Sequence, residues 1–217
     1  MTATGTEKAM NELYTTVKGT ARAEFEEKRS RFIGTVKNVR TEEEAKEFIT
    51  AVSEEFGDAT HNVFAYYLSG GAHARYSDDG EPQGTAGIPV LEMLKKSGAD
   101  DVAVVVTRYF GGTKLGAGGL VRAYTEAAKL AIEKAGIVTL RLFAEFTVRC
   151  RYPEYPAISS KISASGVKTD STDYSDEITL RCAVRADRFD DICSLLGEIT
   201  SGRVRPERTG ERYDCDE

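Results

Sequence analysis

The stretch RYFGGTKLGAGGL, residues 108–120, combines two cations with five glycines between the apolar run VAVVV and a helical pattern. The N-terminus of a helix has unpaired N–H groups and a positive dipole end, and glycine allows an anion to approach the backbone closely. The sequence therefore predicts a phosphate- or RNA-binding loop over 108–122. Its candidate residues are Arg108, Tyr109, Gly111, Gly112, Lys114, Gly116, Gly118, Gly119 and Arg122.

Charge and aromatic content favour this interpretation, although packing turns would also use glycine. No acidic residue lies between Arg108 and Tyr124 in the sequence to cancel the cations. Tyr109, Phe110 and Tyr124 could stack on bases, whereas Tyr109 and Phe110 could instead continue the strand into the core. The glycines match neither GxxxxGK[ST] nor GxGxxG in the correct register, which excludes a Walker loop and a Rossmann fingerprint.

A second candidate segment is SDDGEPQGTAG, residues 77–87, which places three carboxylates before a helix start. They could hold Mg²⁺ beside a substrate phosphate, stabilise the helix N-terminus, or recognise a partner. The sequence contains two histidines, and the first could act as a base or simply as a hydrogen-bonding residue. The candidate accessory site comprises His61, Asp78, Asp79 and Glu81. We assign no catalytic residue, no metal site and no cofactor.

Hydrophobic periodicity places these segments between regular elements in the first half of the chain. The expected elements are strands over 31–39, 61–69 and 101–110, helices over 41–56, 85–97 and 120–135, and a polar loop over 73–84. Thr41 and Glu44 form a capping box, and Gly57 is expected to end that helix in the left-handed conformation. Thr85 is expected to cap the next helix, and Gly98 to stop it. The strand over 101–110 should be buried on both faces.

The second half changes to the order strand, helix, strand, strand, helix, strand. These elements are expected over 142–150, 155–165, 167–175, 177–186, 187–201 and 203–208. This order is typical of a ferredoxin-like βαββαβ unit. The sequence thus predicts an α+β protein with two domains, 1–136 and 137–217.

Composition indicates a soluble globular protein, since 41% of the 217 residues are hydrophobic and 29% are charged. The net charge is −6, and residues 1–136 carry 17 cations against 20 anions, so no global positive field attracts nucleic acid. Any polyanion must bind locally. The four cysteines show no metal-ligand spacing, and we expect reduced thiols. With no apolar leader and no membrane span, we expect a cytoplasmic protein.

The motifs EKRSRF, THNVFAY, SDDGEPQGTAGIPVLEML and VVVTRYFGGTKLGAGGLVRAY resemble, over residues 20–135, those of the YigZ/IMPACT family, also called UPF0029. The C-terminal half resembles the smaller domain of bacterial and archaeal members, which is similar to the last domain of elongation factor G. The resemblance implies that the first domain has a fold like domain 2 of ribosomal protein S five, also found in GHMP kinases. The kinase loop's serines are missing here, which argues against kinase chemistry. Val63 stands where many relatives have cysteine, which argues against a Cys–His catalytic pair.

Eukaryotic relatives regulate translation by binding a ribosome-associated activator of the general-control kinase. The leading hypothesis is therefore a non-enzymatic, translation-associated binding protein that contacts RNA, the ribosome or a translation-regulatory protein through loop 108–122. The alternative is an enzyme that acts on a phosphorylated metabolite in a cleft between 78–87 and 108–122. In a third interpretation, the protein regulates by protein contacts and both motifs are scaffold.

Overall fold

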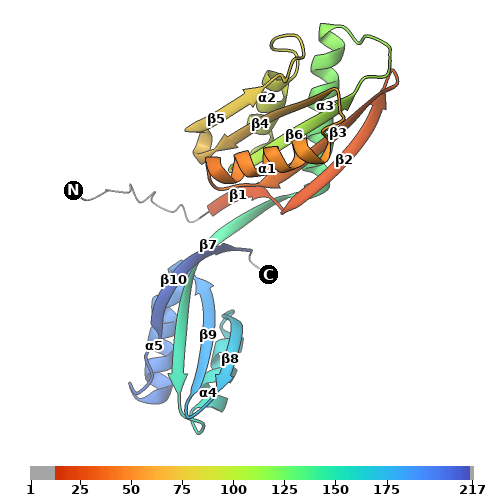
Figure 1. Ribbon diagram of the computed structural model, residues 1–217. Helices are drawn as coiled ribbons and strands as arrows, with labels where there is room; N and C mark the ends of the chain where they lie inside the picture. The colour runs from red at the N-terminus through yellow and green to blue at the C-terminus, as the bar shows by residue number, and fades with distance from the viewer. Residues whose placement is uncertain (1–12, 216–217) are drawn as a thin grey trace, which may run out of the picture. The chain divides into compact units, whose positions relative to one another are not determined.

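The computed structural model describes residues 13–215, which form two compact units, 15–139 and 140–215, the latter including Leu13 and Tyr14 (Figure 1). The N-terminal residues 1–12, in which we expect no apolar leader, lie outside the described residues. The first eleven elements are β1 (Leu13–Val17), β2 (Thr20–Glu27), β3 (Ser30–Asn38), α1 (Glu42–Glu55), β4 (His61–Leu68), a 3-10 turn (Ser69–Gly71), β5 (His73–Ser77), α2 (Gly87–Ser97), β6 (Val102–Tyr109), α3 (Ala117–Ala135) and β7 (Ile137–Cys150). The remaining elements are α4 (Tyr155–Ala164), β8 (Lys168–Tyr174), β9 (Ile178–Arg185), a 3-10 turn (Ala186–Arg188), α5 (Phe189–Thr200) and β10 (Glu207–Asp214).

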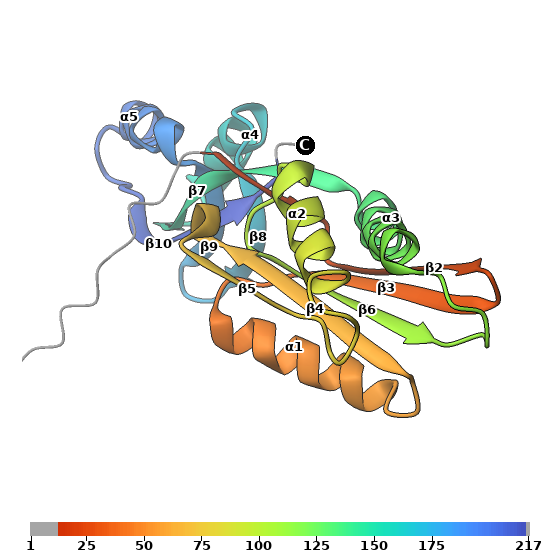
Figure 2. The same cartoon turned by 90° about the horizontal axis from the view of Figure 1, so that it is seen from above.

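An antiparallel sheet in the order β2-β3-β6-β4-β5 organises the first unit. Helix α1 covers one face of this sheet, and α2 and α3 cover the other (Figure 2). Successive side chains of a strand point to opposite faces. The two faces therefore bury separate apolar clusters, one under α1 and one under α2 and α3.

The central strand β6 is buried on both faces, as its continuous apolar sequence predicts. Val102, Val104 and Val106 pack in the cluster beneath α2 and α3, whereas Ala103 and Val105 pack in the cluster beneath α1. Because β6 pairs with β3 on one side and with β4 on the other, its C-terminal end is held at a fixed position. The glycine-rich segment leaves the sheet from that end.

The helix starts and stops follow the predicted signals in part. The Thr41 hydroxyl accepts the N–H of Glu44 and caps α1, and Gly98 ends α2 with a φ of 76°. The prediction for Gly57 is wrong, because the C-cap of α1 is Phe56 and Gly57 has no positive φ. The cap expected from Thr85 is also wrong, because its hydroxyl donates to the Pro82 carbonyl instead.

Two strand assignments differ from the prediction. His73–Ser77, expected to be part of a loop, forms the edge strand β5, which pairs with β4 although its residues are mostly exposed and polar. Strands β1 and β2 were not predicted. The sequence of β2 alternates only partly between apolar and polar residues. It still forms a strand, because β3 supplies its hydrogen bonds.

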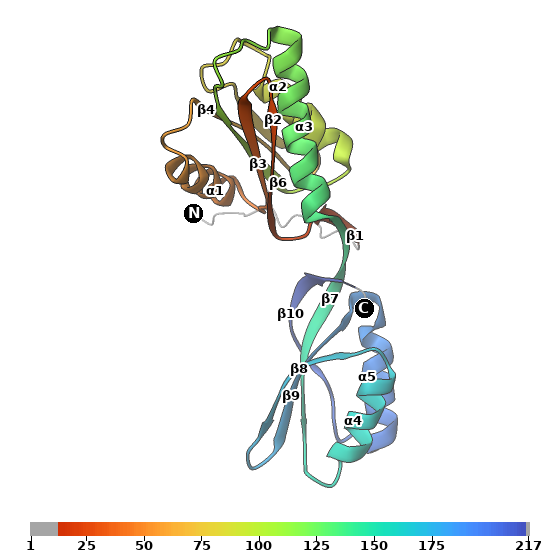
Figure 3. The same cartoon turned by 90° about the vertical axis from the view of Figure 1, so that its right-hand side faces the viewer.

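The second unit contains β7, α4, β8, β9, α5 and β10, and confirms the predicted order of strands and helices. Four strands of its five-stranded sheet run in the order β10-β7-β9-β8 through antiparallel pairs, and α4 and α5 lie together on one face (Figure 3). The last strand, expected over 203–208, is Glu207–Asp214 instead, because residues 201–206 follow α5 before pairing with β7 begins at Glu207. Together the two units make an α+β protein. In the described part of the chain, no helix combines the length and the apolar character that a membrane span requires.

Candidate functional site

A cavity of about 400 Å³ opens where the end of β6, the start of β4 and the start of α3 meet. The strand register brings two of its basic residues together, because His61 at the start of β4 pairs with Arg108 near the end of β6. The turn after β5 adds Glu81, and the glycine-rich segment adds Lys114 and Gly116. The structure therefore brings part of each candidate segment to one cavity.

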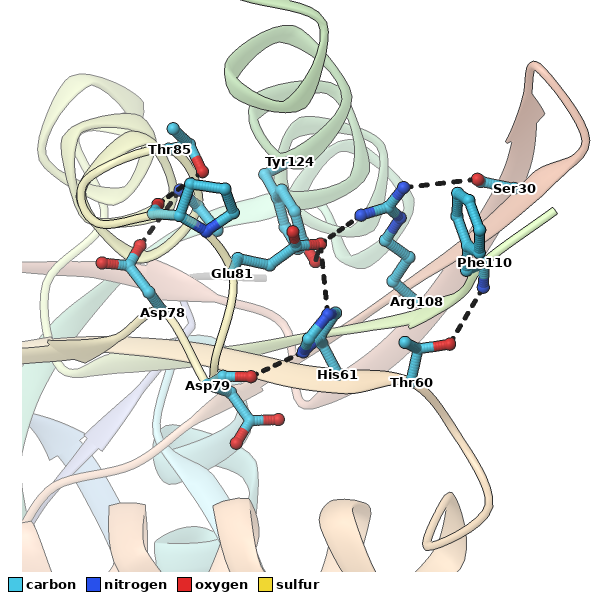
Figure 4. A network of polar contacts seen from close by, with 12 residues as sticks. Ser30, Thr60, His61, Asp78, Asp79, Glu81, Thr85, Arg108, Phe110 and Tyr124 are labelled. Atoms are coloured by element: carbon cyan, nitrogen blue, oxygen red, sulfur yellow. Dashed lines mark hydrogen bonds and ion pairs between the residues drawn. The ribbon is translucent and has the colours of Figure 1, made fainter. Parts of the chain in front are cut away.

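A buried ion pair lines this cavity, and Figure 4 shows its residues. The Arg108 guanidinium donates through Nη1 to Oε1 of Glu81, and these side chains are 6% and 4% exposed. Tyr124 of α3, which is fully buried, donates its hydroxyl to the same Oε1 at 2.8 Å. Burial raises the pKa of Tyr124 far above its ordinary value, so that the phenol keeps its proton and remains a donor. A side chain from the other candidate segment thus neutralises Arg108, which the local sequence does not show.

His61 lies at the edge of the ion pair with a defined orientation. Its Nδ1 is 2.6 Å from the carbonyl oxygen of Asp79. A carbonyl can only accept, so Nδ1 carries the proton and donates. The other ring nitrogen, Nε2, lies 3.9 Å from Oε1 of Glu81. Neutral His61 therefore presents a lone pair on the side of the cavity, and protonated His61 would form an ion pair with Glu81.

The N-terminus of α3 supplies hydrogen-bond donors to the same cavity. Gly116 is the N-cap with a φ of 75° and provides no side-chain cap, and no acidic residue occupies the first turn. The first intrahelical bond runs from Leu120 N–H to the Gly116 carbonyl. Among the described residues, the N–H groups of Ala117, Gly118 and Gly119 have no backbone acceptor. Ala117 lines this cavity, whereas Gly119 lines a separate one. Lys114 lines the same cavity as Ala117 and is exposed. Among the described residues it has no ion-pair partner.

Glycine is present in this segment for different physical reasons at different positions. A Cβ at Gly111 would lie 1.9 Å from the carbonyl oxygen of Arg29, so Gly111 is required for backbone packing. Gly112 and Gly116 have φ values of 86° and 75°, which other residues rarely adopt. Gly118 needs neither, because it is helical and its nearest atom, Nη1 of Arg122, would lie 4.0 Å from a Cβ. A side chain at Gly118 would therefore find open space at the helix entrance.

Some candidate residues lie elsewhere. Tyr109 points to the opposite face of the sheet from Arg108 and donates its hydroxyl to Asp58 at 2.7 Å. Arg122 lines a different cavity, between α3 and β2. Tyr124 is fully buried and is not available to stack on a base. Phe110, in contrast, lines the cavity with 46% of its surface exposed.

The carboxylates of the second segment have separate roles. Asp78 accepts the N–H groups of Gly84, Ala86 and Gly87, and so caps α2 from a distance in sequence. Asp79 accepts the N–H of Asn62. Among the described residues, no group of three or more His, Cys, Asp or Glu side chains could hold a metal ion.

Two residues of the network were missed by sequence reasoning. Ser30, which is fully buried, receives weak donation from Arg108 Nη2 at 3.5 Å and accepts the N–H of Gly111 at 3.2 Å. For Tyr124 the sequence indicates stacking or an apolar helix face, and it gives no sign of the hydrogen bond to Glu81. No spacing signal could have found them, because they come from β3 and α3. The four cysteines are free, as expected.

Comparison with known proteins matches both halves of the chain. Residues 28–132 match the family described as the Impact N-terminal domain, and residues 148–203 match a domain of unknown function, DUF1949. The IMPACT family member YvyE of Bacillus subtilis is 37% identical over 191 residues, which cover 88% of each chain. The IMPACT family member YigZ of Escherichia coli is 33% identical over 181 residues, covering 82% of this chain and 89% of the relative. A solved structure described as an hypothetical protein has 30% identity and a TM-score of 0.61, and the match covers 93% of this chain and 99% of that one.

Proposed function

The chain belongs to the IMPACT family, and from this premise we propose that it is a translation-associated, non-enzymatic binding protein that contacts RNA through the cavity at the start of α3. Translation places this activity in the cytoplasm. The translation link comes from the resemblance to eukaryotic IMPACT proteins. The RNA link comes from the chemistry of the cavity.

The observation that carries the proposal is the uncapped N-terminus of α3 beside Lys114. The N–H of Ala117, the positive end of the α3 dipole and the exposed charge of Lys114 favour a phosphate at this helix start. Because Glu81 neutralises Arg108, Lys114 is the side chain whose charge is available to the ligand. Exposed Phe110 adds an aromatic surface on which a base or ribose can rest.

The test is fluorescence anisotropy with a labelled uridine octanucleotide at several salt concentrations. We expect Lys114→Ala to weaken binding and to reduce the salt slope by about one unit, since one phosphate contact is lost. Lys134→Ala is the matched control, because it removes an exposed lysine from the other end of the same helix. Both variants should melt like the parent. If Lys114→Ala binds like the parent at every salt concentration, the phosphate does not sit at this helix and the proposal fails.

The alternative enzyme hypothesis uses the same cavity. An enzyme that acts on a phosphorylated metabolite would place the phosphate at α3 and use the lone pair of His61 Nε2 as a base. Thermal shift with ribose 5-phosphate distinguishes the two, because stabilisation by the small ligand without RNA binding favours the enzyme. If neither ligand binds at low salt, the scaffold interpretation is the one that survives.

The finer fold relationships belong to this proposal as well. The strand order β10-β7-β9-β8 with two helices on one face supports a ferredoxin-like second unit like the last domain of elongation factor G. For the first unit, we propose the likeness to domain 2 of ribosomal protein S five. Its helices on both faces of an antiparallel sheet accord with this likeness.

A further inference from the structure

Glu81 keeps one carboxylate oxygen without a partner. Its contacts with Arg108, Tyr124 and His61 all involve Oε1. Among the described residues, Arg108 Nε is the one fully buried side-chain N or O atom that lacks a hydrogen-bond partner. Oε2 of Glu81, which also lacks a partner, is therefore not fully buried. Because Glu81 lines the cavity, we infer that Oε2 faces it.

This oxygen can only accept a hydrogen bond. The carboxylate faces the permanently charged guanidinium of Arg108 and receives the Tyr124 hydroxyl, so its charge is stabilised where it stands. An ionised carboxylate has no proton to donate. A ligand that fills the cavity must therefore bring a hydrogen-bond donor to Oε2. Without one, it would remove water from a charged acceptor and leave that acceptor without a hydrogen bond, which costs binding free energy.

The same cavity has a second requirement, at the N-terminus of α3. There the unpaired N–H groups and Lys114 favour an anion, while the Glu81 carboxylate repels one. A ligand that satisfies both places an anion at the helix and a hydroxyl or ammonium donor between that anion and Glu81. A bare phosphate or an acidic side chain does not meet this description.

A ribonucleotide does. Its 2′-hydroxyl is on the carbon next to the one that carries the 3′-phosphate, and it can donate to a carboxylate while the phosphate is held elsewhere. Deoxyribose has no such donor. A volume of about 400 Å³ suits one small ligand, and the exposed ring of Phe110, at 5.4 Å from the Arg108 guanidinium carbon, provides an apolar surface for the sugar or base.

We propose that Glu81 Oε2 accepts the 2′-hydroxyl of an RNA nucleotide whose 3′-phosphate lies at the N-terminus of α3, so that this cavity distinguishes RNA from DNA. The proposal rests on the proposed RNA-binding function. It adds a specificity-determining residue and the chemical group that this residue recognises.

The test compares three labelled octanucleotides on the unaltered protein: uridine, deoxyuridine and 2′-fluoro-deoxyuridine. All three have the same bases and phosphates. The 2′-fluoro sugar is similar in size and pucker to ribose but has no donor. We expect the ribo-octamer to bind roughly tenfold more tightly than either of the others, the size of effect of one hydrogen bond to a charged group. The salt slopes of the three should be equal.

The outcomes separate this inference from the function on which it rests. If none of the octamers binds at low salt, the RNA-binding function itself fails. If all three bind equally, RNA binding stands and the 2′-hydroxyl inference is overturned. Equal binding of the ribo- and 2′-fluoro-octamers would also overturn it, because sugar shape rather than a donor would then be recognised. Displacement of the ribo-octamer by an equal concentration of uridine 3′-monophosphate would overturn the assignment to RNA in favour of a free nucleotide.

A variant locates the effect at the named atom. Glu81→Gln replaces an acceptor by an amide group that can donate, so the preference for ribose should disappear while the octamers still bind. Glu92→Gln is the matched control, because it makes the same change at an exposed position of α2 and should keep the preference. The ligand series on the unaltered protein decides the question even if Glu81→Gln folds poorly.

Discussion

Breaking the buried pair of Arg108 and Glu81 should destabilise the first unit strongly. The two side chains are 6% and 4% exposed, so neither charge can be solvated in place of its partner. Arg108→Met keeps most of the apolar stem length and removes the guanidinium. Glu81 then remains buried, and the Tyr124 hydroxyl is the donor left within hydrogen-bond distance of its Oε1.

The magnitude follows from the burial. Removing one partner of a buried ion pair costs about 3–5 kcal/mol, since an uncompensated charge remains. The Tyr124 hydroxyl offsets part of this cost, and we expect a loss of about 3 kcal/mol for Arg108→Met. Glu81→Gln should cost a similar amount. Because both single variants lose the same interaction, the double variant should cost about 2 kcal/mol less than the sum of the two.

Hydrogen exchange of peptides from β6 is a suitable assay. This central strand pairs on both sides, so its amides exchange when the first unit unfolds, whatever happens in the second unit. A loss of about 3 kcal/mol lowers protection roughly a hundredfold. Urea unfolding followed by the same peptides provides an independent measure.

The reasoning is refuted if the losses of unfolding free energy in the two single variants add up in the double variant. It is also refuted if Arg108→Met keeps the hydrogen-exchange protection of the parent. Either result would mean that the two side chains do not depend on one another for compensation of charge. Lys96→Met is the control for the loss of an exposed cation from the same unit, and should change protection little.

Four further predictions concern other parts of the chain. Val104→Asp places an unpaired charge at a fully buried position of β6, so the first unit should unfold, and a soluble variant with protected β6 amides would contradict this. Gly116→Val should destabilise the first unit by about 1–2 kcal/mol because of its positive φ, whereas Gly118→Ala should be neutral or stabilising by up to about 1 kcal/mol; urea unfolding with equal effects at both sites would refute the distinction. The fragment 137–217 should fold alone, and amide spectra typical of a random coil would count against it. Two arginines lower the pKa of Glu154 to about 2 from 4.5, so its contribution to stability is present above pH 4.5 and is lost as the pH falls toward 2; Glu154→Gln should remove this part of the acid dependence in urea titrations of the second unit, and an unchanged pH profile would refute it.

Local patterns in the sequence determine much of the fold. The unbroken apolar run of residues 102–106 predicts a strand that is buried on both faces, because no polar side chain is available for a solvent-facing side. The Thr41 cap and the stop at Gly98 are likewise local, since each depends on a few residues around one helix end. The alternation of elements after Gly136 predicts the βαββαβ order.

Local patterns fail where an element is stabilised by a distant partner. His73–Ser77 is polar and exposed, and it is a strand because β4 supplies its hydrogen bonds. The cap of α2 comes from Asp78 and not from Thr85, because the turn folds the Asp78 carboxylate back onto the helix start. The strand contact has no sequence signature, whereas the carboxylates of 77–87 indicate a role at the helix start without showing that Asp78 fills it.

The candidate site divides in the same way. The sequence by itself determined that residues 108–119 join a buried strand to a helix through glycines, and hence that unpaired N–H groups lie beside Lys114. Only the tertiary structure decided that Arg108 is not a free cation, because pairing of β4 with β6 and the turn after β5 bring His61 and Glu81 to it. It also decided that Arg122 and Tyr109 point elsewhere. The physical reason is that the charge available to a ligand depends on distances between side chains, and residues far apart in sequence set those distances only when the sheet has formed.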